Sequence, residues 1–200
     1  MTIFNPPQIQ IKMKRILLFM MAMVAVSVLN AQQPQNASAE NGTTSQGANN
    51  SSAAEIEWLT WDEAVKRMEK EPRKIMIDVY TDWCGWCKKM DATTMKDPTV
   101  AQLMGESWYA VKMDGERKED IIFKGRTYKF VAQGRRGYHE LPAELMNGRM
   151  SYPTLVFLDE QYKVIQPLPG YRQAPELEKI LAYFGGDFYK NTDWEKFSAD

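Results

Sequence analysis

Apolar residues in the central part of the chain recur at intervals typical of regular secondary structure. Thr60 and Glu63 match the capping box that opens many helices. We expect a helix from there to about residue 71, because apolar residues follow at helical spacing, namely Trp61, Ala64, Val65 and Met68. Residues 74–80 form a short apolar run rich in strand-forming residues, which predicts a buried strand.

Strands and helices continue to alternate further along the chain. The pattern predicts one helix over residues 84–95 and another that starts at Asp97, with Pro98 in its first turn. A last main helix is expected to begin at Pro175 and to end at Gly185. Strand-like apolar segments lie between these helices, at residues 107–113, 154–159 and 163–166. The sequence therefore predicts an α/β domain whose sheet is covered by helices on both faces.

The N-terminal 31 residues are typical of an export signal. Three basic residues at positions 12–15 precede the run 16–29, in which only Ser27 is not apolar. A cleavage site is expected after Ala31, and Met13 is a second candidate start of translation. The apolar run is shorter than the roughly 20 residues that span a bilayer. Its length favours a cleaved signal peptide over the alternative, an uncleaved membrane anchor.

The next segment, residues 32–54, contains no Leu, Ile, Val, Met, Phe, Trp or Tyr. Such a segment buries too little apolar surface to offset its ordering entropy, so we expect a flexible linker. The folded domain is then expected to occupy residues 55–200. The whole chain carries a formal net charge of −1, which gives no reason to expect a nucleic-acid partner.

Both cysteines of the chain, Cys84 and Cys87, lie in the stretch TDWCGWC. Small exported domains that depend on disulfides usually carry four or more cysteines, and a loop this short removes little entropy from the unfolded chain. A zinc site would need two further ligands, and His139 is the only histidine. Lys88 follows the pair, where haem attachment requires histidine. Redox chemistry remains, without a metal or another cofactor.

The position of the pair between a strand and a helix suggests how it would work. Cys84 is expected at the helix N-terminus, where free N–H groups and the helix dipole favour a thiolate. Cys87 follows one turn later on the same face. The sequence thus predicts Cys84 as the accessible nucleophile and Cys87 as the buried resolving cysteine.

At these residues the chain resembles the thioredoxin superfamily, over roughly residues 55–186. Trp83, Gly85 and both cysteines match the family's WCGPC motif. Asp78, six residues before Cys84, matches the buried carboxylate that moves the proton of the resolving cysteine. Pro153, in the stretch SYPT, matches the family's cis-proline beside the active site. The resemblance implies a thioredoxin-like fold with a central mixed sheet.

This sequence also departs from the family pattern. Trp86 replaces the motif's proline, and Tyr152 precedes the expected cis-proline. We expect no lysine opposite Asp78, because Ala110 is the nearest match to the lysine that thioredoxins place there. Residues 115–150 form an insertion that a minimal thioredoxin lacks, and residues 187–200 are expected to add a short C-terminal helix.

Each candidate residue also has a purely structural interpretation. Asp78 can be a hydrogen-bonded structural acid, although its spacing to Cys84 favours proton transfer. His139, within the insertion, is expected to be structural. Five basic residues lie within 121–137, where we expect a hairpin with a solvated basic face rather than a nucleic-acid site. A substrate-binding surface is expected around the pair, formed by Trp83, Gly85, Trp86, Tyr152 and Pro153.

Two functions of different classes follow from the sequence. The favoured one is a thiol–disulfide oxidoreductase of the cell envelope that exchanges disulfides with exported proteins, mainly in the reducing direction, and is kept reduced by a membrane electron donor. The resemblance to exported bacterial thioredoxin-like proteins implies this setting. The alternative is a redox-inert thioredoxin-like binding or chaperone module.

Overall fold

The computed structural model describes residues 55–199. The predicted signal peptide and linker lie outside this range. Within residues 55–199, no helix combines the length and apolar character that crossing a membrane requires.

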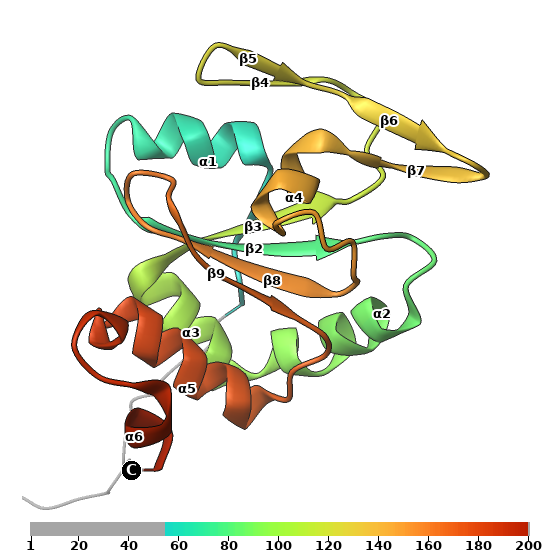
Figure 1. The fold of residues 1–200 in the computed structure, drawn as a ribbon. Coiled ribbons are helices and arrows are strands. Elements are labelled where there is room, and N and C mark those ends of the chain that lie inside the picture. The colour runs from blue at the N-terminus through green and yellow to red at the C-terminus, as the bar shows by residue number, and fades with distance from the viewer. Residues whose placement is uncertain (1–54, 200) are drawn as a thin grey trace, which may run out of the picture. The chain divides into compact units, whose positions relative to one another are not determined.

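A five-stranded mixed sheet forms the centre of the domain, with the strand order β1-β3-β2-β8-β9 (Figure 1). β1, β3 and β2 run parallel to one another, whereas β8 is antiparallel to β2 and to the edge strand β9. The bounds of the strands are Trp58–Leu59 (β1), Lys74–Tyr80 (β2), Trp108–Asp114 (β3), Thr154–Leu158 (β8) and Val164–Pro169 (β9). The predicted α/β fold with a central mixed sheet is confirmed.

Helices cover both faces of this sheet and enclose two apolar cores (Figure 1). One core lies under α1 (Trp61–Met68) and α4 (Glu140–Leu145), and the other lies among α2 (Gly85–Ala92), α3 (Pro98–Ser107) and α5 (Ala174–Gly185). Successive residues of a strand point to opposite faces. Strand β2 therefore sends alternate residues to the two cores, with Ile75, Ile77 and Val79 in the first and Met76 in the second.

The helix expected over residues 84–95 is divided in two. α2 ends at Ala92, and a 3-10 turn, η1 (Thr94–Lys96), follows. The hydroxyl of Thr93 donates to the carbonyl of Lys89 at 2.7 Å, and the backbone at Thr93 leaves helical geometry. Threonine can compete with the backbone in this way, which sequence periodicity does not register.

Two hairpins and α4 occupy the chain between β3 and β8. The first hairpin joins β4 (Ile121–Phe123) to β5 (Arg126–Tyr128) through Lys124 and Gly125, as expected, and both turn residues have positive φ. The second hairpin, β6 (Phe130–Gln133) with β7 (Arg136–His139), was not expected. The amide of His139 donates to the carbonyl of Gly115 at 2.8 Å, so the end of β7 is bonded to the end of β3.

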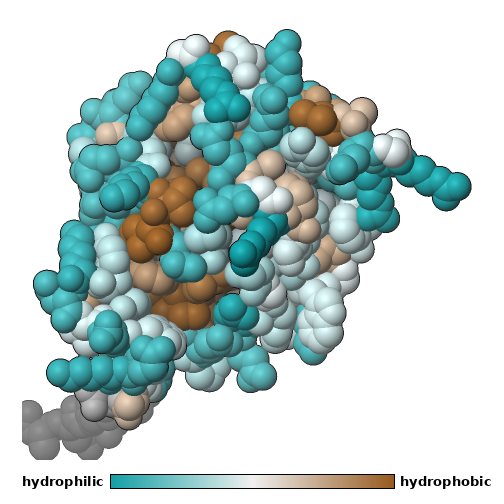
Figure 2. Space-filling model, in the orientation of Figure 1, coloured by the Kyte–Doolittle hydropathy of each residue, from teal (hydrophilic) through white to brown (hydrophobic). Residues whose placement is uncertain are grey.

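The exposed edge of the sheet is β9, where two prolines interrupt the row of free N–H groups. Pro167 and Pro169 pair with Val156 and Thr154 of β8. Proline at an edge strand prevents another chain from adding to the sheet. Figure 2 shows apolar surface near the middle of this face, where Figure 1 places β9, with hydrophilic side chains around it.

The C-terminal segment packs against α5. It consists of η2 (Phe188–Lys190) and α6 (Trp194–Ala199). The ring of Tyr183 on α5 lies 5.2 Å from that of Trp194 and 5.0 Å from that of Phe197, measured between centroids. These contacts attach α6 to α5.

Candidate active site

Cys84 and Cys87 lie at the start of α2 and are joined by a disulfide bond. Cys84 is the N-cap residue, and its sulfur accepts the N–H of Cys87 at 3.0 Å. The N–H of Cys84 donates to the carbonyl of Thr81, which closes the turn between β2 and the helix. The first sulfur is thus at the positive end of the helix dipole.

The two cysteines differ less in exposure than the sequence suggested. Cys84 is 4% exposed and Cys87 is 1% exposed. Cys84 is therefore the more accessible sulfur, but only by a narrow margin. The neighbours Trp83, Gly85 and Trp86 are exposed, so a partner would approach the disulfide over these residues.

Asp78 lies wholly inside the domain, on strand β2. It alternates with Ile77 and Val79, so its side chain points to the face that α2, α3 and α5 cover. Its Oδ2 accepts a hydrogen bond from Nζ of Lys112 at 2.7 Å, whereas its Oδ1 has no partner among the described residues. Burial raises the pKa of this carboxyl above its usual value, and the charge of Lys112 opposes that rise only in part.

The expectation that no lysine lies opposite Asp78 is wrong. The parallel register of β2 and β3 pairs Asp78 with Lys112 and places Ala110 opposite Met76. A slip of two residues leaves every side chain on the same face, so the apolar pattern does not distinguish the two registers. The signal present in the sequence was a single lysine inside an otherwise apolar strand.

Lys112 also binds the carboxylate of Asp91, on α2. Cys87 precedes Asp91 by four residues, so the two side chains share one face of α2. That face meets Lys112 and, through it, Asp78. Lys112 thus links the buried carboxyl group of Asp78 to the face of α2 that also carries Cys87.

Aromatic side chains surround the outer side of the disulfide. Trp83 and Trp86 are 50% and 58% exposed. The ring of Tyr152 contacts Trp83 edge to face, with 5.8 Å between centroids. The Tyr152–Pro153 peptide bond is cis, and Thr154, the next residue, pairs with Val79 near the end of β2. All the residues expected to form the substrate-binding surface therefore lie near the same end of the sheet.

Tyr152 is held against the first residue of the insertion. A side chain at Gly115 would lie 2.4 Å from the Tyr152 hydroxyl, so only glycine fits there. Burial, followed by the negative charges of Glu116 and Asp114, raises the pKa of Tyr152 to about 12. Tyr152 is therefore a neutral phenol at physiological pH and offers an aromatic surface rather than a charge.

His139 is buried and caps a helix. Its Nδ1 accepts the N–H of Leu141 at 3.2 Å at the start of α4, while its Nε2 has no partner among the described residues. Burial lowers the pKa of the imidazole, which keeps it neutral. Its contacts are those of a structural residue. Within residues 55–199, no three His, Cys, Asp or Glu side chains are grouped so as to hold a metal ion.

Curated proteins with related sequences include two that are much longer than this chain. The thiol:disulfide interchange protein DsbD of Haemophilus influenzae (strain PittEE) is 33% identical over 93 residues, which cover 44% of this chain and 15% of that protein. Spermatogenesis-associated protein 20 of Homo sapiens is 28% identical over 67 residues, which cover 33% of this chain and 8% of that protein. This chain thus spans only a small part of either relative.

A solved structure and a family model agree on the fold. A thioredoxin-fold protein from Helicobacter pylori matches with a TM-score of 0.50 and 14% identity, over 71% of this chain and 84% of that one. Residues 41–167 match the family model Thioredox_DsbH, whose description reads "Protein of unknown function, DUF255". This match covers more than half of the sequence. The chain therefore belongs to the Thioredox_DsbH family, within the thioredoxin superfamily.

Proposed function

We propose that this protein is a thiol–disulfide oxidoreductase that reduces disulfide bonds in other proteins. The observation that carries the proposal is the placement of Cys84 and Cys87 at the start of α2, a helix that Lys112 connects to the buried Asp78 through Asp91. The similarity to a thiol:disulfide interchange protein supports the same class of reaction.

The reaction begins with the reduced pair. The thiolate of Cys84 attacks one sulfur of a substrate disulfide, forms a mixed disulfide, and releases the other substrate sulfur as a thiolate that takes up a proton. Cys87 then loses its proton and attacks the sulfur of Cys84. This step forms the Cys84–Cys87 disulfide seen in the structure and releases the second substrate thiol. Two electrons pass from the cysteine pair to the substrate.

Asp78 is the proposed acceptor of the proton that Cys87 loses. A carboxylate whose pKa is raised is a stronger base than an ordinary surface carboxylate and can accept a thiol proton more readily. Lys112 holds one carboxylate oxygen, which leaves Oδ1 free to take the proton.

Insulin reduction with dithiothreitol as electron donor tests the proposal. The wild-type protein should accelerate precipitation of the insulin B chain, and Cys84→Ser should abolish the acceleration. Cys87→Ser should accumulate mixed disulfides with substrates, whereas Cys84→Ser should trap few. A wild-type protein that is as slow as Cys84→Ser would support the redox-inert binding module instead. The reverse trapping pattern would exchange the roles of the two cysteines.

We base the proposed reducing direction on Trp86, the residue directly before Cys87. Strong oxidants of this fold stabilise the reduced thiolate, often through a histidine at this position. Trp86 stands there and its ring carries no charge, so Cys84 is only moderately stabilised as a thiolate. We expect a reduction potential nearer to the roughly −270 mV of thioredoxin than to the about −120 mV of the strong bacterial oxidant. Equilibration against a dithiothreitol or glutathione series measures it, and a midpoint above about −150 mV would indicate an oxidase.

The setting of the reaction is proposed from the N-terminal sequence. A cleaved signal peptide would place the protein in the cell envelope, among exported protein substrates and in need of a membrane electron donor. N-terminal sequencing of the protein isolated from cells should start at or near Gln32. An intact N-terminus in the membrane fraction would favour an anchored protein.

A further inference from the structure

Each exposed tryptophan beside the disulfide carries a cationic side chain. The guanidinium carbon of Arg136 lies 3.8 Å from the centroid of the Trp83 ring. Nζ of Lys89 lies 4.8 Å from the centroid of Trp86 and 5.3 Å from that of Tyr171. Cation–π contacts of this kind fix the charge over the ring. One positive charge is therefore held on each of the two exposed tryptophans next to the cysteines.

Neither charge is neutralised within the part of the chain that the structure describes. Arg136, its neighbour Arg135 and Lys89 have no carboxylate within ion-pair distance there. By contrast, Arg126 in the other hairpin of the insertion is paired with Glu144. The two cations at the site are free to bind an external carboxylate.

The β6–β7 hairpin of the insertion places Arg136 over the ring of Trp83. Hairpin β6–β7 is fixed at its base by the bond from His139 to Gly115. At Gly137 a side chain would lie 2.3 Å from the carbonyl of Val131 and 2.2 Å from the Phe130 ring, so the strands approach closely because this residue is glycine. Figure 1 shows the hairpin extending toward the end of the domain where α2 begins.

The acidic residue next to Trp83 does not compete for Arg136. Asp82 is exposed but forms no ion pair with it among residues 55–199. Asp82 instead lines a pocket together with Asp114, Glu116 and Glu119, and neither tryptophan lines that pocket. The acidic side chains of this pocket share it with Lys112, Arg117 and Lys118, and neither Arg136 nor Lys89 lines it.

We propose that Arg136 and Lys89 form two binding positions for acidic side chains on either side of a substrate disulfide. The preferred substrates are then polypeptides whose cysteines are flanked by Asp or Glu. This inference rests on the proposed reductase function and names the substrate class for the same site. It also gives the β6–β7 hairpin a role in recognition.

The expected contribution of each cation is modest. Both side chains are exposed, and an exposed ion pair changes an equilibrium by about two- to fivefold. The two positions lie on different tryptophans, so their effects should multiply approximately. Salt should weaken both, because mobile ions screen exposed charges.

Three synthetic peptides test the preference. They share one intramolecular disulfide and differ only in the flanking residues, which are Glu, Ser or Lys. The reduced wild-type protein should act on them with kcat/KM in the order Glu, Ser, Lys. Arg136→Gln and Lys89→Gln should each lower kcat/KM for the Glu peptide about two- to fivefold and leave that for the Ser peptide nearly unchanged. The matched control is Lys163→Gln, an exposed lysine between β8 and β9 that should change nothing.

The possible results separate this inference from the reductase function. Equal kcat/KM for the three peptides overturns the preference alone. An equal loss on all peptides in Arg136→Gln and Lys89→Gln also overturns it, because the cations would then act on the Cys84 thiolate. Failure to reduce insulin or any peptide overturns the proposed function and the substrate class with it. A Glu preference that disappears at about 0.5 M salt, where the Debye length is only a few ångströms, supports the inference.

Discussion

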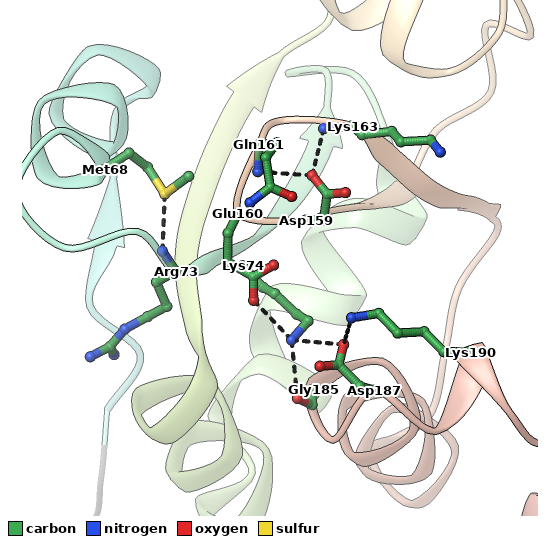
Figure 3. A network of polar contacts seen from close by, with 10 residues as sticks. All are labelled: Met68, Arg73, Lys74, Asp159, Glu160, Gln161, Lys163, Gly185, Asp187 and Lys190. Atoms are coloured by element: carbon green, nitrogen blue, oxygen red, sulfur yellow. Dashed lines mark hydrogen bonds and ion pairs between the residues drawn. The ribbon is translucent and has the colours of Figure 1, made fainter. Parts of the chain in front are cut away.

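Two lysines on neighbouring strands, Lys74 and Lys112, each form ion pairs with two carboxylates, but the two groups differ in how well their charges are compensated. Lys74 begins β2 and is 6% exposed. Its Nζ donates to the carbonyl of Gly185 at 3.3 Å and lies 3.0 Å from Glu160 and 3.1 Å from Asp187 (Figure 3). Asp187 is also 3.0 Å from Nζ of Lys190. Both carboxylates keep contact with water, so every charge in this group has a partner or solvent.

Lys112, by contrast, holds a carboxyl group that has no access to water. Asp78 is wholly buried and keeps one oxygen without a partner among residues 55–199. The second carboxylate on this lysine, Asp91, is 42% exposed and competes for the same ammonium group. The Lys74 group satisfies its charges, while the Lys112 group leaves the charge of Asp78 only partly compensated.

The pKa of Asp187 and the pKa of Asp78 shift in opposite directions, so the two lysine groups affect the stability of the fold differently. Burial opposes the charge on Asp187, but Lys190 and Lys74 outweigh it and lower its pKa, so this group stabilises the fold at neutral pH. The pKa of Asp78 is raised, so the folded state binds its proton more tightly than the unfolded chain does. The associated stability is present below the unfolded pKa and is lost as the pH rises through the folded pKa. A carboxylate retained at such a cost is typical of a functional site.

The largest effect is expected from Asp78→Asn. The amide cannot accept the proton of Cys87, so turnover in insulin reduction should fall on the order of 100-fold, a usual magnitude for a lost general base. In the wild type, turnover should fall at low pH as Asp78 becomes protonated, and we call this part of the pH profile the acid limb. Asp78→Asn should lose the acid limb. An unchanged rate and profile would reduce Asp78 to a structural acid and remove the contrast between the two lysines.

The same variant should be more stable than the wild type at neutral pH. Removing a buried charge whose pKa is raised removes its cost, and the gain should vanish at low pH, where the wild-type carboxyl is protonated. Urea unfolding at several pH values measures this difference. Asp78→Glu, which restores a carboxyl group, is the matched control and should restore the acid limb in part.

Lys74→Met should have the opposite signature, a loss of stability with turnover unchanged. The substitution removes the bond to Gly185 and the partner of two carboxylates, for a cost of about 2 kcal/mol in the free energy of unfolding. Lys190→Met is the control, because it meets the same Asp187 but is 51% exposed and should cost less than about 0.5 kcal/mol. Lost turnover in folded Lys74→Met would show that the two groups are coupled.

How much of this could be predicted from the sequence depends on whether the signal is local. The Cys84–Cys87 pair, the helix that follows it and the turn at Lys124 and Gly125 could be predicted, because each depends only on residues close together in the sequence. Lys112 was missed because strand register depends on packing between distant segments. Hairpin β6–β7, which brings Arg136 onto Trp83, is local, and it was missed because the turn signal at Gly134, which has positive φ, was not used. The cysteine chemistry was accessible from the sequence, and its electrostatic surroundings were not.

Lys112→Met should sharpen the assignment of the acid limb to Asp78. The ammonium group is what opposes the effect of burial, so its removal should raise the pKa of Asp78 further and move the acid limb to higher pH. Turnover at neutral pH should fall about tenfold, less than for Asp78→Asn, because the carboxyl remains. Lys112→Arg keeps the charge and should keep the limb close to its wild-type position. A limb that stays in place in Lys112→Met would assign it to another group.

The smallest effect is expected from Asp91→Asn, and its sign is opposite to that of Lys112→Met. The charge of Asp91 raises the pKa of Asp78, and its carboxylate shares the ammonium group of Lys112. With the uncharged amide at position 91, Lys112 should interact with Asp78 alone. The pKa of Asp78 should then fall, and the acid limb should move to lower pH. Because Asp91 is partly exposed and screened by water, turnover at neutral pH should change less than about threefold. Asp62→Asn, on α1 across the sheet, is the control and should leave the profile unchanged. A shift to higher pH in Asp91→Asn would mean that Asp91 orients Lys112 toward Asp78 rather than drawing it away.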